Sequence, residues 1–157
     1  MDKLWAPWRI NYVSGKKKSK GCVFCQAKRS ESRDFVIFRT KFSVAMLNIY
    51  PYNNGHVLIA PLRHIRDISQ MRENELLDLF KSVDKARSLL AEVLKPQGYN
   101  IGINLTRVAG AGITGHLHVH IVPRWAGDTN FMPVVFGTKI ISQSLTQLAK
   151  KLKDANR

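Results

Sequence analysis

The sequence lacks any long hydrophobic run. No stretch approaches the roughly 18 apolar residues of a membrane-spanning helix, and residues 1–15 contain no apolar run of the kind found in signal peptides. We therefore expect a cytoplasmic protein without a membrane segment. At 157 residues the chain is long enough for one domain with a real core and too short for two comfortable ones.

Acidic residues are also scarce. Eleven Asp and Glu stand against 25 Lys and Arg, which gives a net charge of +14. Part of the excess lies in two clusters, Lys16–Lys20 and Lys150–Lys153. Such clusters are typical of a solvated loop and a solvated helix face, and they also attract phosphate on a nucleotide or a nucleic acid. The charge favours an anionic partner without identifying it.

Cysteine is limited to one C-x-x-C pair, Cys22 and Cys25. In a cytoplasmic protein such a pair indicates metal ligation or redox chemistry rather than a structural disulfide. A thioredoxin-like site needs the pair at the start of a helix that follows a buried strand. Here the pair follows a loop rich in Gly and Lys, which favours a metal.

Histidines are few, but three of the five alternate with aliphatic residues within residues 115–124. This period-two pattern predicts a β-strand with all three imidazoles on one face. The three are His116, His118 and His120. Three groups that titrate near neutral pH are poor choices for a core face or a solvated face, so the row indicates a reactive or metal-bound site.

Two chemistries compete for this row. All three imidazoles could bind one metal, or one imidazole could attack an electrophile such as phosphorus while its neighbours hold the anion. The cysteine pair leaves a tetrahedral zinc short of two ligands, which His64 and one member of the row could supply. That arrangement is a closed, structural Cys2His2 site, and it keeps two histidines of the row for chemistry.

Elsewhere the pattern alternates between strands and helices. Residues 35–38, 42–47, 57–60 and 99–105 read as strands, with a further short strand at 134–136. Apolar spacing predicts a main helix over 73–95 and a basic C-terminal helix over 141–155. We expect one apolar face of the main helix to pack on the sheet. Its residues are Leu76, Leu77, Phe80, Val83, Leu90, Val93 and Leu94. The fold class is α+β.

Several motifs in order resemble the histidine triad (HIT) superfamily. They are LWAPWR, CVFC, LNIYPYNNGH, a P-x-x-H, NIGINL, AGAGI, HLHVHIVPRW and GDTNFMPV. The chain is most similar to the branch of diadenosine tetraphosphate phosphorylases and Fhit-like dinucleoside polyphosphate hydrolases. The resemblance implies one HIT domain over residues 1–157, with an N-terminal arm and basic loop at 1–20. It also implies an antiparallel sheet of about five strands packed with a long helix and a C-terminal helix.

The resemblance implies a role for each triad histidine. His118 becomes the nucleophile that forms a nucleotidyl-histidine, and His120 lies against the α-phosphate oxygens. The implied ligands of a structural zinc ion are Cys22, Cys25, His64 and His116.

Further substrate contacts follow from the same resemblance. Asn48, eight residues before His56, takes the position of a ribose-binding asparagine, and His56 supports the hydrogen bonding of the triad. Many relatives carry a Gln four residues before the first triad histidine, where this chain has Gly112. Thr114 or Asn104 could supply the missing polar group. The Gly-rich loop at this position fits the phosphorylase branch better than Fhit itself.

The expected activity is cleavage of diadenosine polyphosphates at the α-phosphate, with phosphate or water as the final acceptor. One alternative is a Hint-like purine nucleoside phosphoramidase, although Hint proteins usually have Asp where Asn48 stands. Another is a non-catalytic module that binds nucleotides or nucleic acid through its positive charge. Family members are commonly homodimers, so we expect a homodimer here.

Overall fold

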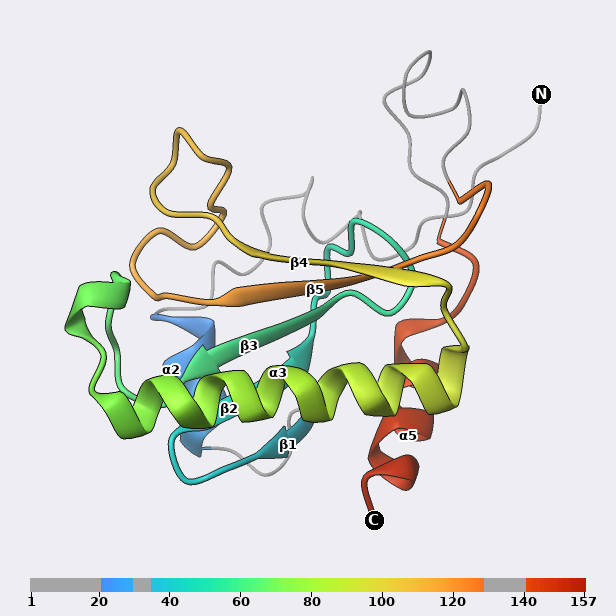
Figure 1. Cartoon of the computed structure of the whole chain (residues 1–157), viewed down its shortest axis with the longest axis horizontal. Coiled ribbons are helices and arrows are strands. Elements are labelled where there is room, and N and C mark those ends of the chain that lie inside the picture. Colours follow the sequence, from blue (N-terminus) through green and yellow to red (C-terminus); the bar gives the residue numbers. More distant parts are fainter. Residues whose placement is uncertain (1–20, 30–34, 129–140) are drawn as a thin grey trace.

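The computed structural model describes residues 21–29, 35–128 and 141–157, and the site is built on the sheet within them. Five strands form one antiparallel sheet in the order β1-β2-β3-β5-β4. The long helix α3 lies along one face of this sheet, as Figure 1 shows. The predicted α+β class and the sheet of about five strands are confirmed.

Consecutive strands account for most of the sheet. β1 (Val36–Arg39) and β2 (Ser43–Leu47) form the predicted hairpin, and β3 (Val57–Pro61) pairs with the full length of β2. β4 (Gly98–Ile103) is an edge strand. β1, β2 and β3 are almost entirely buried because both sheet faces are covered, which explains their continuous apolar runs.

The histidine strand begins later than its alternation predicts. β5 covers Val119–Arg124, so His116 and His118 precede it and only His120 lies within it. Pairing with β3 ends at Ile59 opposite Val119, and the amide of Leu117 instead donates to the Ile65 carbonyl at 2.6 Å. The expectation of a regular strand from residue 115 is therefore wrong, because the chain leaves the sheet there to meet the segment after β3.

Helix α3 (Glu73–Leu94) matches the predicted main helix and ends at Lys95, whose backbone is left-handed. Its packing face agrees with the expected one in part, because Val83 and Leu90 are buried and Val93 and Leu94 pack against the core. Leu76, Leu77 and Phe80 are exposed, and Phe80 retains 59% of its accessible surface. The buried stripe consists of Leu79, Val83, Ala86, Leu89 and Leu90, which are spaced three or four residues apart or adjacent. The apolar residues of this helix exceed what one face can bury.

The sheet separates two clusters of buried side chains. On the α3 side, residues of β2, β3 and β5 pack with α3 and with the C-terminal helix α5 (Leu145–Ala155). On the opposite side, α2 (Val23–Arg29) places Phe24 and Ala27 against alternate residues of β2 and β3. Leu58 belongs to this second cluster and is paired with His120. The α2 face of the sheet is therefore the face that carries the triad.

Helix α5 begins four residues later than predicted, after Ser144 in an extended conformation. Its buried residues Leu148, Ala149 and Leu152 anchor it to the core. Within the described ranges, no helix combines the length and the apolar character that a membrane crossing requires. The N-terminal arm and basic loop at 1–20 and the expected strand at 134–136 lie outside the described residues.

Candidate functional site

Four predicted metal ligands from distant parts of the chain come together at one end of the sheet. Their donor atoms all lie within 4.8 Å of one another, and they belong to Cys22, Cys25, His64 and His116. The Cys22 sulfur is 3.2 Å from His116 Nδ1, and the Cys25 sulfur is 3.1 Å from His64 Nδ1 and 3.7 Å from His116 Nδ1. Helix α2 begins between the two cysteines, which brings both thiols to one side.

The donor set fits a tetrahedral zinc ion. Zinc–sulfur and zinc–nitrogen bonds of ordinary length place neighbouring S and N donors about 3.6 Å apart, close to the observed spacings. His116 is 1% exposed, and its Nε2 atom lies 2.8 Å from the Pro61 carbonyl oxygen. Because a carbonyl only accepts, Nε2 carries the proton, and the lone pair of Nδ1 faces the two sulfurs. The lone pairs of the four side chains are thus oriented as metal ligands.

The buried imidazole of His118 is held in one tautomer. Its Nδ1 atom donates to the carbonyl oxygen of His116 at 2.8 Å, so Nε2 carries the lone pair. Burial lowers the pKa of His118 below its usual value, and the hydrogen bond to His116 offsets part of that shift. The ring of Phe24 lies 5.2 Å from the His118 ring. His118 therefore presents a neutral, nucleophilic nitrogen at neutral pH.

A second pair of histidines forms a hydrogen-bond relay. The backbone amide of Tyr52 donates to His56 Nδ1 at 3.0 Å, so the proton of His56 is on Nε2. That Nε2 atom lies 2.9 Å from His120 Nδ1, which must accept. His120 therefore carries its own proton on Nε2. Burial, followed by the charges of neighbouring histidines, lowers the pKa of His56 to about 3 and that of His120 to about 4.

The loop that carries His56 is shaped by Gly55. This residue has φ of +76°, and a Cβ atom there would lie 2.5 Å from Leu94 of α3. Only glycine fits both the left-handed backbone and the close approach. Asn53 is buried in the same loop and donates to the Pro123 carbonyl at 3.0 Å. The N-N-G-H sequence, residues 53–56, thus holds the loop that carries His56 against β5.

Asn48 uses its side chain within its own loop. Its Oδ1 accepts from the Tyr50 amide at 2.9 Å, and its Nδ2 lies 3.3 Å from His56 Nδ1. These contacts are those of a turn residue that also steadies His56. The ribose-binding role implied by the resemblance stays a prediction.

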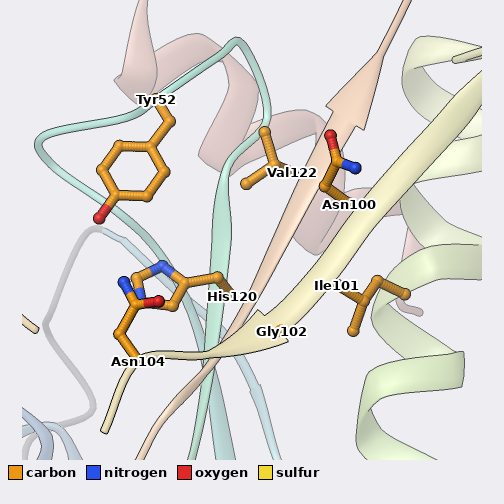
Figure 2. A pocket seen from close by; sticks show the side chains of 7 residues that line it. All are labelled: Tyr52, Asn100, Ile101, Gly102, Asn104, His120 and Val122. Carbon is orange, nitrogen blue, oxygen red and sulfur yellow. The ribbon is translucent and has the colours of Figure 1, made fainter. Parts of the chain in front are cut away.

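The other expected substrate contacts fall into two groups. Asn104 lines an open depression beside His120, whose further walls come from Tyr52, β4 and Val122 (Figure 2). Gly112 and Thr114 lie on the exposed loop that precedes the triad, and neither lines this depression. The substrate contacts expected of Gly112 and Thr114 therefore stay predictions.

Sequence reasoning did not find five of the seven residues that line the depression. They are Tyr52, Asn100, Ile101, Gly102 and Val122. The Tyr52 ring stacks on the His120 ring at 5.5 Å with an angle of 11° between planes. Asn100 and Gly102 are alternate residues of β4, Asn104 follows directly after the strand, and Gly102 pairs with His120. The alternation in residues 99–105 gave the signal for one shared face, but the pairing partner of that face required the sheet order.

A salt bridge beside the metal ligands was also missed. Arg63 donates to both carboxylate oxygens of Glu75 at 2.8 and 2.7 Å, and it also contacts the Gln70 carbonyl. Glu75 accepts from the Arg72 amide at 2.9 Å as well. The hydrogen bond from Arg63 lowers the pKa of Glu75 to about 2. This pair ties the segment that carries His64 to the first turn of α3.

Comparisons with known proteins identify the family of the chain. Residues 29–127 match the HIT domain family. The chain is 34% identical to an "AP-4-A phosphorylase" of Mycobacterium tuberculosis over 161 residues, covering 97% of this chain and 83% of the relative. It is 38% identical over 101 residues to a "Bis(5'-nucleosyl)-tetraphosphatase [asymmetrical]" of Schizosaccharomyces pombe, covering 64% of this chain and 55% of that one.

Solved structures share the fold. A "ZN-bound histidine triad family protein" from Mycobacterium smegmatis superposes with a TM-score of 0.68 at 23% identity, covering 85% of this chain and 91% of the other. The sheet order, the clustered imidazoles and these matches place the chain in one class: it belongs to the HIT family. The family predicted from the sequence is therefore confirmed.

Proposed function

We propose that this protein transfers a nucleotidyl group from diadenosine polyphosphates, such as diadenosine tetraphosphate, to phosphate or water. The observation that carries the proposal is the fixed tautomer of His118, whose Nδ1–H is bound to the His116 carbonyl and whose Nε2 lone pair is available. The similarity to an "AP-4-A phosphorylase" supports this substrate class. A phosphoanhydride repels an anionic attacker, so a neutral imidazole suits the reaction.

In the first step, the Nε2 lone pair of His118 attacks the α-phosphorus. A P–N bond forms, the bond to the bridging oxygen breaks, and that oxygen departs with the electron pair on the leaving nucleotide. His120 donates its Nε2–H to a phosphate oxygen and thereby stabilises the charge that builds up. The relay from Tyr52 through His56 supports this assignment, because it keeps the proton of His120 on the outer nitrogen.

In the second step, an oxygen of phosphate or water attacks the same phosphorus and displaces Nε2 of His118. Phosphate as acceptor makes the protein a phosphorylase, and water makes it a hydrolase. The substitution of Gly112 for the Gln of many relatives leaves the preceding loop without that side chain. Together with the similarity to the mycobacterial phosphorylase, this supports phosphate as the acceptor.

We also propose a structural zinc ion at Cys22, Cys25, His64 and His116. The spacing of the four donor atoms and the Zn-bound relative support it. When bound, zinc would supply four bonds that close the site and leave no position open for catalysis. His116 would have two further roles. Its Nε2–H donates to the Pro61 carbonyl, and its own backbone carbonyl accepts from Nδ1 of the proposed nucleophile His118.

A homodimer is the proposed assembly. Exposed apolar side chains support it, because Leu77 and Phe80 of α3 and Ile101 of the edge strand β4 are 58%, 59% and 45% exposed. Exposed apolar side chains that form a large patch mark protein interfaces. Sedimentation velocity should give twice the mass of one chain, and a species of single-chain mass at micromolar concentration would refute the dimer.

Product analysis tests the proposed activity directly. Purified protein is incubated with diadenosine tetraphosphate, with and without inorganic phosphate. ADP formed together with ATP only when phosphate is present identifies a phosphorylase, whereas AMP and ATP formed in water identify a hydrolase. Release of AMP from adenosine 5'-phosphoramidate without any turnover of the dinucleotide would overturn the proposal in favour of a phosphoramidase.

A further inference from the structure

A buried carboxylate outside the triad collects hydrogen bonds just after the end of β5. The side chain of Asp128 is 8% exposed. Its Oδ2 atom accepts from Arg124 Nε at 2.7 Å and from the Trp125 amide at 3.1 Å, and its Oδ1 atom accepts from Arg124 Nη2 at 2.8 Å. A carboxylate held by a two-pronged arginine contact and a backbone amide has a fixed position and orientation. Neither step of the proposed reaction uses it.

Asn53 connects this carboxylate to the loop that carries His56. Both hydrogens of its side-chain amide are engaged, because Nδ2 donates to Asp128 Oδ2 at 2.7 Å and to the Pro123 carbonyl at 3.0 Å. The residue is 7% exposed, and its backbone carbonyl accepts from the His56 amide at 3.2 Å. Asp128 therefore holds the loop at a point next to the histidine relay.

The relay itself needs a group that sets its direction. A hydrogen bond between two neutral imidazoles can run either way, because each ring has one donor and one acceptor nitrogen. Both rings are neutral at neutral pH, since burial, followed by the charges of neighbouring histidines, lowers the pKa of His56 to about 3 and that of His120 to about 4. The direction is therefore decided by a contact from outside the pair.

The backbone amide of Tyr52 is the shortest such contact. It donates to His56 Nδ1 at 3.0 Å, whereas Asn48 Nδ2 lies 3.3 Å from the same atom. If the Tyr52 amide turned away, only the longer contact would oppose a proton on Nδ1 of His56. The pair would then reverse, with His120 Nδ1 donating to His56 Nε2 and a lone pair on His120 Nε2.

Reversal of the pair would oppose the proposed chemistry. A lone pair on the outer nitrogen of His120 repels phosphate oxygens, whereas an N–H there stabilises their charge. Tyr52 directly precedes Asn53 in the chain, so the residue that Asp128 anchors is the one that limits rotation of the Tyr52 amide. The contacts thus form one path from the carboxylate to the donor: Asp128, Asn53, Tyr52, His56 and His120.

On the basis of the proposed function, we propose that Asp128 is a positioning residue for the reaction. Through Asn53 it holds the Tyr52 amide on His56, and it thereby keeps the proton of His120 on Nε2. Its effect on turnover depends on the proposed function, but the tautomer is a property of the protein without substrate. The two can therefore be tested separately.

Nitrogen NMR of zinc-saturated protein with 15N-labelled histidine measures the tautomer, because the 15N chemical shift separates a protonated ring nitrogen from an unprotonated one. Asp128→Asn keeps the size of the side chain and removes its charge and one acceptor oxygen. Glu75→Gln is the matched control. The Arg63–Glu75 and Arg124–Asp128 pairs both have an N–O distance of 2.7 Å, and their carboxylate side chains are 6% and 8% exposed.

In Asp128→Asn we expect the His120 Nε2 signal to shift from the protonated range towards the mean of the two forms, with the Nδ1 signal moving the opposite way. Glu75→Gln should leave both signals in place. Asn53→Ala, which keeps the Arg124–Asp128 pair, should reproduce the shift. The double variant should shift no further than the stronger single variant, because both substitutions break one path.

Turnover should follow the tautomer. Only the fraction of protein with the proton on His120 Nε2 is competent, so kcat/KM for diadenosine tetraphosphate should fall in proportion to that fraction, about twofold where the two forms are equally populated. A loss of kcat/KM that matches the NMR shift across Asp128→Asn and Asn53→Ala supports the positioning role. Melting temperatures report the separate effect of each substitution on stability.

Unchanged histidine signals in Asp128→Asn, with a lower melting temperature, would overturn the positioning role and leave the proposed function standing. Equal shifts in Glu75→Gln would overturn it as well, because they would reflect general loosening. If Asp128→Asn does not fold, Asn53→Ala decides, and unchanged signals there have the same meaning. If the signals respond as expected but the wild-type protein turns over no dinucleotide, the proposed function fails and the positioning of the His120 proton stands.

Discussion

The Nδ1 atom of His118 donates a hydrogen bond of 2.8 Å to the carbonyl oxygen of His116, whose side chain belongs to the group of candidate metal ligands. His116 thus directs its ring towards the cysteine sulfurs and its backbone carbonyl towards the proposed nucleophile. Displacement of His116 would therefore change both the metal site and the tautomer of His118. The backbone of His116 therefore connects the candidate metal site to the proposed nucleophile His118.

Removal of the nucleophile should abolish turnover. We expect His118→Gly to lower kcat for diadenosine tetraphosphate by about a thousandfold or more, as for other nucleophiles of this kind. Added imidazole should restore part of the rate by entering the space of the lost ring. Steady-state kinetics with and without imidazole measure this, and circular dichroism checks the fold. A variant that kept a tenth of the activity without imidazole would show that His118 is not the nucleophile.

Zinc should stabilise the protein only through the four clustered side chains. Elemental analysis should find about one zinc per chain. With free zinc at 1,000 times its Kd, the unfolding free energy of the wild-type protein should rise by about 4 kcal/mol. Cys22→Ser should lose most of that gain and should match the wild-type protein once both are stripped by a chelator. Equal stabilisation of both proteins by zinc would place the metal elsewhere.

The Arg63–Glu75 pair should support both stability and metal binding. Glu75→Gln leaves Arg63 with a weaker acceptor, so the segment that carries His64 should loosen, and zinc affinity and melting temperature should both fall. Asp84→Asn is the matched control, because the Arg87–Asp84 pair is similarly short but its carboxylate side chain is 70% exposed, compared with 6% for Glu75. A competition assay with a chromophoric chelator measures zinc affinity. Equal effects of the two substitutions would count against a positioning role.

Acid should destabilise the fold through the buried relay. The pKa of His56 falls from 6.5 to about 3 on folding, mainly because of burial. Below pH 6.5 His56 is therefore protonated in the unfolded chain and stays neutral in the folded protein. The unfolding free energy falls as the pH drops towards 3. The slope contributed by one such histidine is up to about 1.4 kcal/mol per pH unit.

Denaturant unfolding between pH 7 and pH 4 measures this slope. His56→Gln removes the titrating group, so its stability should depend less steeply on pH than that of the wild-type protein. Zinc release in acid affects both proteins, and the difference between the two slopes removes its contribution. Identical slopes would mean that folding does not lower the pKa of His56.

Local patterns in the sequence were sufficient to predict several features. Short apolar runs and period-two alternation identified the strands, and the apolar spacing of residues 73–94 identified α3. The chemistry of the two thiols predicted a metal site completed by His64 and one triad histidine, and the structure brings Cys22, Cys25, His64 and His116 together. The strands and the helix follow from the pattern of neighbouring residues. The metal site follows from the preference of zinc for thiolate and imidazole ligands. The confirmed family follows from the order of the motifs along the chain.

Local patterns were not sufficient to predict the packing face of α3 or the start of β5. Leu76, Leu77 and Phe80 are as apolar as the residues that α3 buries, and only the position of the sheet decides which side is covered. The alternation at His116 and His118 looks like that of a strand, but β3 ends its pairing at Val119. Both outcomes depend on which segment lies opposite, and that partner is remote in sequence.

The sequence by itself determined which groups take part: two thiols, five imidazoles and the glycines around them. Only the tertiary structure decided what each imidazole does, because a tautomer depends on the hydrogen-bond partner. Pro61 leaves Nδ1 of His116 for a metal, the His116 carbonyl leaves Nε2 of His118 for attack, and His56 leaves a proton on Nε2 of His120. In the proposed function these three chemically identical side chains are a metal ligand, a nucleophile and a hydrogen-bond donor.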